Sequence, residues 1–81
     1  MNHHPLTVYT TPGCPQCTLT LKALDDAGIP YRLINLAVDP GALEHVKAAG
    51  FRQAPVVEGA GETWAGFRPD RISELVKERA L

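Results

Sequence analysis

Residues 6–17 of the chain read Leu6-Thr7-Val8-Tyr9-Thr10-Thr11-Pro12-Gly13-Cys14-Pro15-Gln16-Cys17. The first six of these residues have the β-branched and aromatic composition of a strand, and a Pro-Gly turn follows them. The segment from Cys14 to about Ala27 is typical of a helix, with Pro15 in the first turn, where its missing N–H costs nothing. The stretch therefore predicts a strand, a turn and a helix, with both cysteines of the chain at the start of that helix.

The two cysteines are placed where a thiol can become reactive. The first turn of a helix has N–H groups without partners and a partial positive charge, so a thiolate there is stabilised and available as a nucleophile. A Cys-x-x-Cys pair in this setting is typical of a redox-active dithiol. We expect Cys14 to be the exposed nucleophile and Cys17 to face inward and resolve the mixed disulfide. Pro15 and Gln16 are expected to set the geometry and the redox potential of the pair.

Other interpretations of the cysteines are less well supported. A zinc site needs four ligands, commonly in two pairs, and only three histidines could supplement the two cysteines. His3 and His4 stand at the N-terminus, where solvated side chains without a function are the commoner outcome, and His45 stands alone. Inert buried cysteines are typical of a strand or the middle of a helix, whereas prolines and a glycine surround this pair. We therefore predict no metal site, with a zinc or iron–sulfur module as the remaining alternative.

Size and charge limit the possible functions. The 81 residues predict one domain, residues 1–81. A net charge of −1 gives no reason to expect nucleic acid or an anionic membrane as a partner, and no apolar run approaches the ~20 residues that span a bilayer. No positively charged segment followed by an apolar one is visible at the N-terminus, so no secretory signal is predicted. A reactive dithiol then suits the reducing cytoplasm, and we expect a monomer.

The rest of the chain alternates strand and helix patterns. The predicted elements are a strand at 30–36, a helix at 40–49, strands at 55–58 and 62–65 and a helix from Pro69 onward. Asp39 before Pro40 is a favourable helix start, and Gly59-Ala60-Gly61 is typical of a hairpin turn. The order β-α-β-α-β-β-α fits an α/β protein with a four-stranded mixed sheet and helices on both faces. The cysteines then lie beyond the carboxyl end of the first strand, where sites gather in such sheets.

Apolar spacing assigns an inward face to each predicted helix. In the first helix it consists of Cys17, Leu21 and Leu24, broadened by Leu19 and Ala23. In the second it consists of Leu43, Val46 and Ala49. In the last it consists of Ile72, Leu75 and Val76. We expect these side chains to pack against the sheet.

Three stretches, residues 8–17, 50–57 and 64–70, together resemble the small glutaredoxin-like redoxins of the NrdH-redoxin family. They occur in order and at the family's spacing, and the resemblance covers about residues 6–76. It implies a minimal thioredoxin fold with three helices flanking the sheet. It also implies a thiol–disulfide oxidoreductase that acts as an electron carrier and binds no cofactor itself.

The resemblance further implies partners. Members of the family take electrons from NADPH through thioredoxin reductase and pass them to the large subunit of a class Ib ribonucleotide reductase. Glutaredoxins proper usually carry a Gly-Gly turn and acidic residues that hold glutathione, whereas this chain has Trp64-Ala65-Gly66-Phe67-Arg68-Pro69, which counts against glutathione binding. Pro15 departs from the aliphatic residue frequent in this family and also occurs in glutathione-dependent glutaredoxins, so that alternative stays open.

Further site residues are implied by the same resemblance. Ala54-Pro55 resembles the family's cis-proline loop, which prevents strand pairing and presents the Ala54 backbone to an extended substrate. The resemblance assigns partner binding to Trp64, Phe67, Arg68 and Asp70. We expect Trp64 to be partly exposed, in a surface network with Arg68 and Asp70. Phe67 equally fits a core aromatic, and Arg68 and Asp70 equally fit solvated residues at a helix start.

Overall fold

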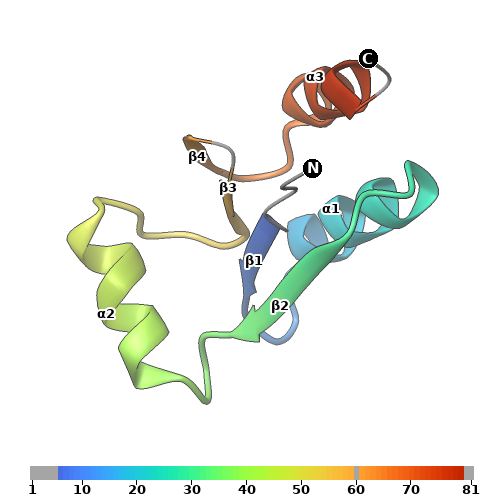
Figure 1. Ribbon diagram of the computed structural model, residues 1–81. Helices are drawn as coiled ribbons and strands as arrows, with labels where there is room; N and C mark the ends of the chain where they lie inside the picture. The colour runs from blue at the N-terminus through green and yellow to red at the C-terminus, as the bar shows by residue number, and fades with distance from the viewer. Residues whose placement is uncertain (1–5, 60, 80–81) are drawn as a thin grey trace.

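The computed structural model describes residues 6–59 and 61–79, so His3, His4 and Ala60 lie outside the described residues. Its elements are β1 (Leu6–Thr10), α1 (Pro15–Asp26), β2 (Tyr31–Asn35), α2 (Pro40–Ala48), β3 (Val56–Gly59), β4 (Glu62–Ala65) and α3 (Pro69–Arg79). Figure 1 shows their arrangement. The predicted element order is confirmed.

The four described strands form one mixed sheet in the order β2-β1-β3-β4. β1 pairs with β2 in parallel, and β3 is antiparallel to both β1 and β4. This is the α/β arrangement that the alternation of patterns predicts. β3 begins at Val56, one residue later than expected, because Pro55 has no N–H to donate to a strand ladder.

Apolar side chains form two clusters, one on each face of the sheet. The larger cluster consists of Leu6, Val8, Leu24, Ile29, Val57, Trp64, Ile72 and Leu75. The smaller cluster consists of Tyr9, Leu36, Val46 and Val56. Successive strand residues such as Val8 and Tyr9 belong to different clusters because side chains alternate between the two faces of a strand. α1 and α3 therefore cover one face, and α2 covers the other (Figure 1).

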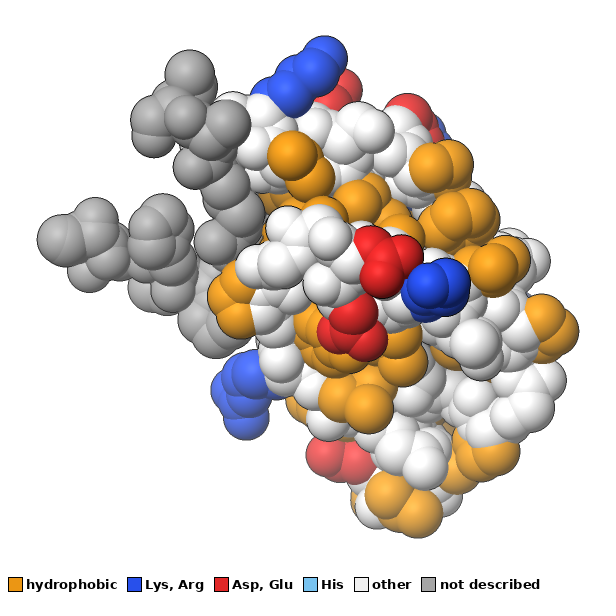
Figure 2. Space-filling model, turned by 90° about the vertical axis from the view of Figure 1, so that its right-hand side faces the viewer, with side chains coloured by type: hydrophobic (Ala, Val, Ile, Leu, Met, Phe, Trp, Pro, Cys, Tyr) orange, Lys and Arg blue, Asp and Glu red, His pale blue; other side chains and the backbone are white. Residues whose placement is uncertain are grey.

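The buried stripe of each helix is narrower than the spacing predicts. Leu19 of α1 is 49% exposed and Val76 of α3 is 42% exposed, and Ala49 is also exposed. Each helix contacts only one face of a small sheet, so residues at the edges of its stripe stay in solvent. Figure 2 shows apolar side chains at the surface, scattered among acidic and basic ones. None of the described helices has the length and apolar character needed to cross a membrane.

Candidate active site

Cys14 is the residue that caps the N-terminus of α1. It keeps an extended backbone, with φ −101° and ψ 107°, and its Sγ accepts a hydrogen bond from the backbone N–H of Cys17 at 3.2 Å. Gly13 takes φ +70° in the preceding turn, a conformation that glycine adopts without steric cost. Pro15 occupies the first turn of the helix. The sequence prediction that this sulfur lies against a helix N-terminus is confirmed.

Cys17 lies one turn further along α1 and is only 4% exposed, whereas Cys14 is partly exposed. Burial, and then a hydrogen bond with Cys14, raise the pKa of the Cys17 thiol to about 11. Both cysteines are free thiols, so this is the reduced form. The pair thus combines an accessible outer sulfur with a buried inner one.

The loop before β3 brings backbone to the outer thiol. The Ala54–Pro55 peptide bond is cis, as expected, and the Cys14 thiol donates to the Ala54 carbonyl oxygen at 3.7 Å. The Pro55 carbonyl oxygen accepts a hydrogen bond from the Gly66 N–H at 2.8 Å. Two chain segments that are distant in the sequence therefore meet beside Cys14.

Gln16 connects the turn that contains the two cysteines, residues 12–17, to the segment between β4 and α3. We call residues 12–17 the redox turn. The Gln16 Oε1 accepts a hydrogen bond from the Phe67 N–H at 3.1 Å. A side chain at Gly66 would begin 3.3 Å from the same oxygen, and Gly66 has φ +87°, so this close approach favours glycine. Phe67 itself packs against the larger cluster. Gln16 is thus more than a solvated first-turn residue, because it bridges to the neighbouring loop.

Comparison with known proteins identifies the family of this chain. The Glutaredoxin family model matches residues 6–64. The chain belongs to the glutaredoxin family. It is 43% identical to the glutaredoxin-like protein NrdH of Escherichia coli K12 over 70 residues, 86% of each chain, and 40% identical to that of Salmonella typhimurium over the same share. The solved structure of the NrdH-redoxin from Escherichia coli superposes with a TM-score of 0.86, at 42% identity, over 89% of this chain and 95% of that one.

These relatives and the fold make the chain a glutaredoxin-like thiol–disulfide oxidoreductase of the NrdH type. Cys14 and Cys17 are the only two cysteines of the chain. In the described part of the chain, no three His, Cys, Asp or Glu side chains gather as metal ligands.

The structure corrects the expectation for Trp64. Its side chain is 5% exposed and belongs to the larger cluster, so the predicted place in a surface network is wrong. Trp64 lies opposite Val57 in the β3–β4 pair. Side chains paired in this way share one face of the sheet, and α3 covers that face. The large apolar area of the indole is therefore buried there.

Arg68 and Asp70, which were expected in a surface network, pair with each other. Arg68 donates through Nε to Oδ1 at 3.1 Å and through Nη2 to Oδ2 at 2.8 Å. The hydrogen bonds from Arg68 lower the pKa of the Asp70 carboxyl. Gln16 bonds to the Phe67 backbone and not to this pair. The pair is solvent-exposed and directly follows Phe67, whose N–H bonds to Gln16, so we call it the rim of the site.

A polar cluster on the α2 face was not predicted. Glu58 of β3 accepts a hydrogen bond from the Tyr9 hydroxyl at 2.8 Å, and its other oxygen lies 2.8 Å from His45 Nε2. These two contacts, that of His45 first, lower the pKa of Glu58. Burial, and then the Glu58 contact, raise the pKa of Tyr9 to about 12. No sequence signal joins three residues so far apart, because only the strand pairing brings them together.

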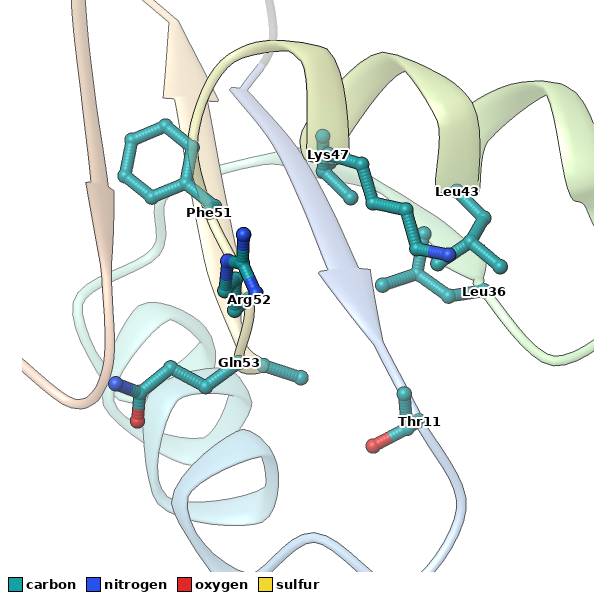
Figure 3. Close-up of a pocket in the computed structure, with 9 residues that line it drawn as sticks. Thr11, Leu36, Leu43, Lys47, Phe51, Arg52 and Gln53 are labelled. Carbon is teal, nitrogen blue, oxygen red and sulfur yellow. The ribbon is translucent and has the colours of Figure 1, made fainter.

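A cavity next to the redox site was also missed. It has a volume of about 510 Å³ and lies between α2 and the loop that leads to β3 (Figure 3). Two cations, Lys47 and Arg52, line it. The sequence signals only its positive charge, because residues 45–57 contain no Asp or Glu but include both of these cations.

Proposed function

We propose that this protein carries electrons from NADPH, through a thioredoxin reductase, to protein disulfides in the reducing cytoplasm. Its proposed target is the large subunit of a class Ib ribonucleotide reductase, a partner implied by the resemblance to the NrdH-redoxin family. The observation that carries the proposal is the position of the Cys14 sulfur. It caps α1, is partly exposed and contacts the Ala54 carbonyl oxygen. An extended substrate can therefore lie along the Ala54 backbone with its disulfide at this sulfur.

The proposed reaction is two successive thiol–disulfide exchanges. The Cys14 thiolate attacks one sulfur of the substrate disulfide, so that the substrate S–S bond breaks, a mixed disulfide forms and one substrate thiolate leaves. Cys17 then loses its proton and attacks the Cys14 sulfur, which releases the second substrate thiolate. Two electrons and two protons pass to the substrate, and this chain retains a Cys14–Cys17 disulfide for its reductase.

The raised pKa of Cys17 fits its proposed resolving role. A buried thiol does not compete with Cys14 for external disulfides, because the thiolate is the nucleophile and burial disfavours it. Once a substrate is bound to Cys14, the neighbouring sulfur is held close enough that exchange becomes intramolecular. The roles of the two cysteines thus follow from their different burial.

A protein reductase is favoured over glutathione as the electron source. The segment after β4 lacks a Gly-Gly turn, and Gln16 bonds to the Phe67 backbone there. Arg68 is engaged by Asp70 in the same segment. In this proposal, the Phe67 N–H and the Arg68 guanidinium are therefore already engaged within the protein and are less available to hold glutathione. The Escherichia coli relative is described by a thioredoxin-like activity profile, and we infer the same for this protein.

Two steady-state assays with matched enzyme concentrations test the proposal. One couples NADPH oxidation to thioredoxin reductase, this protein and a protein disulfide, and the other uses glutathione and glutathione reductase. We expect turnover in the first assay and little in the second. Cys14→Ser should abolish turnover, and Cys17→Ser should accumulate the mixed disulfide, visible by mass spectrometry. A clear preference for glutathione would assign the protein to the glutathione-dependent glutaredoxins instead.

A further inference from the structure

The cavity beside the redox site has an apolar lining. This lining comes from Leu36, Leu43, Val46 and Phe51. In Figure 3, Leu43 and Lys47 come from α2, whereas Arg52 and Gln53 come from the loop before β3, so that the cavity opens between the two segments. Leu43 and Phe51 are only partly buried. An aliphatic side chain entering from solvent would therefore bury its own apolar surface together with theirs.

The cavity adjoins the hollow that contains the reactive thiol. Ala54 lines the cavity, and its carbonyl oxygen is the group that Cys14 contacts at 3.7 Å. Thr11 lines both this cavity and the shallower hollow that contains Cys14. An extended chain advances about 3.3 Å per residue. A peptide whose sulfur is at Cys14 would therefore place a residue a few positions away over the cavity.

The charged residues that line the cavity are all positive. Lys47 and Arg52 are its charged lining residues, and no carboxylate lines it among the described residues. Other surface cations, such as Arg68 and Arg71, form ion pairs, whereas no ion pair is found for Lys47 or Arg52 within residues 6–59 and 61–79. The protein as a whole carries a net charge of −1. Arg32 and Lys77 also form no ion pair among the described residues, but they do not line the cavity. Lys47 and Arg52 thus place two positive charges at the cavity, which complement an acidic group.

We propose that this cavity is a recognition subsite for the protein substrate. It takes an aliphatic side chain near the substrate disulfide, with an acidic residue of the same segment beside Lys47 and Arg52. The inference rests on the proposed function and specifies its substrate class as disulfides within acidic, aliphatic segments. Lys47 and Arg52 are recognition residues and take no part in the thiol exchange.

Three synthetic peptides test the subsite. Each carries one intramolecular disulfide, flanked on both sides by Leu and Glu in the acidic peptide, Leu and Lys in the basic peptide and Ser and Glu in the polar peptide. Pre-reduced protein is mixed with each peptide in the absence of any reductase, and the rate constant of peptide reduction is measured. At low salt we expect the acidic peptide to react about fivefold faster than the basic one. It should react about tenfold faster than the polar one, and the charge preference should weaken at high salt.

Charge-reversing variants locate the effect. Lys47→Glu should reverse the preference between the acidic and basic peptides. The matched control Lys77→Glu, an exposed cation of α3, should retain the wild-type preference. Equal rates for the acidic and basic peptides, or equal effects of the two variants, would overturn the subsite while leaving the proposed function intact. Failure to reduce any of the three peptides would instead contradict the proposed function. If Lys47→Glu folds poorly, the rates of the three peptides with the wild-type protein still test the subsite.

Discussion

The two faces of the sheet differ in how completely they are packed. Among the described residues, the cluster under α1 and α3 contains eight buried residues, including Leu24 and Val57 with no exposed surface. The face under α2 buries four and leaves the cavity at its edge. The redox turn is attached to the first face through α1, and the cavity belongs to the second.

The two faces of the sheet therefore suit two different requirements of a small redox protein: fixed thiols and an open surface for a partner. The positions of the thiols have to be fixed, and close packing under α1 holds Cys17 inside and Cys14 at the helix end. Recognition needs apolar surface that is still open to a partner, and in the proposed subsite the thinner α2 face would supply it. The loop containing Ala54 joins the two, because it contacts Cys14 and also lines the cavity.

The largest effect expected from this comparison is on stability. Leu24→Ala should lower the free energy of unfolding by about 3 kcal/mol, since a fully buried leucine leaves a cavity that the surroundings only partly fill. Leu43→Ala on the α2 face should cost about 1 kcal/mol, since Leu43 is already partly in solvent. Urea titrations of the two variants measure the difference. Equal losses would mean that the α2 face is as tightly packed as the other.

Thiol reactivity should differ by about a hundredfold, the next largest effect. With a pKa of about 11, the Cys17 thiol is roughly one part in a thousand thiolate at pH 8, and it is buried. Alkylation of the reduced protein at pH 8, followed by peptide mass mapping, should therefore label Cys14 first. Cys14→Ser should leave a slowly labelled protein, and Cys17→Ser a rapidly labelled one. Faster labelling of Cys17 would reverse the assignment of nucleophile and resolving thiol.

Features of the redox turn could be predicted because they are local. The strand, the Pro-Gly turn and the cysteines lie within residues 6–17, and their order alone predicts Cys14 at a helix end. The cis bond before Pro55 was expected from a resemblance in the adjacent residues. Each of these signals is contained in a few consecutive positions, so no knowledge of the sheet is needed.

The features that escaped prediction depend on the pairing of distant segments. Trp64 is buried because β4 pairs with β3 in a register that places the indole opposite Val57. The contact of Glu58 with Tyr9 and His45 requires β3 to lie beside β1 and α2 to cross that face. Residue spacing within one helix, likewise, does not reveal how much of Leu19 the neighbouring elements cover.

The Glu58 cluster should make the attachment of α2 dependent on pH. The contacts of Glu58 with His45 and then Tyr9 lower its pKa below the usual value of 4.5. Their stabilising effect is therefore present above about pH 4.5 and is lost as the pH falls through the lower, folded-state pKa. The effect should be small, because the Glu58 side chain is 36% exposed and solvent screens it.

Urea titrations of wild type and Glu58→Gln between pH 3 and pH 6 measure this dependence. The wild type should be the more stable protein at pH 6, and the difference should shrink toward acid pH. Glu44→Gln, an exposed position in α2, is the matched control and should differ little from wild type at either end of the range. A difference for Glu58→Gln that does not change with pH would mean that the carboxylate charge plays no part.

The smallest effect should come from the rim of the site. Arg68 and Asp70 form two hydrogen bonds, yet their side chains are 45% and 61% exposed. Because water and salt screen an exposed pair, Asp70→Asn should shift the urea midpoint less than Leu43→Ala does. Asp70 also lies in the first turn of α3, where a negative charge is favourable, so any small loss should disappear at about 1 M salt. A loss of stability as large as that of Leu43→Ala, and unchanged in salt, would contradict this expectation. It would show that the Arg68–Asp70 pair fixes the segment after β4 as firmly as apolar packing fixes α2. The rim would then belong with the packed face of the sheet.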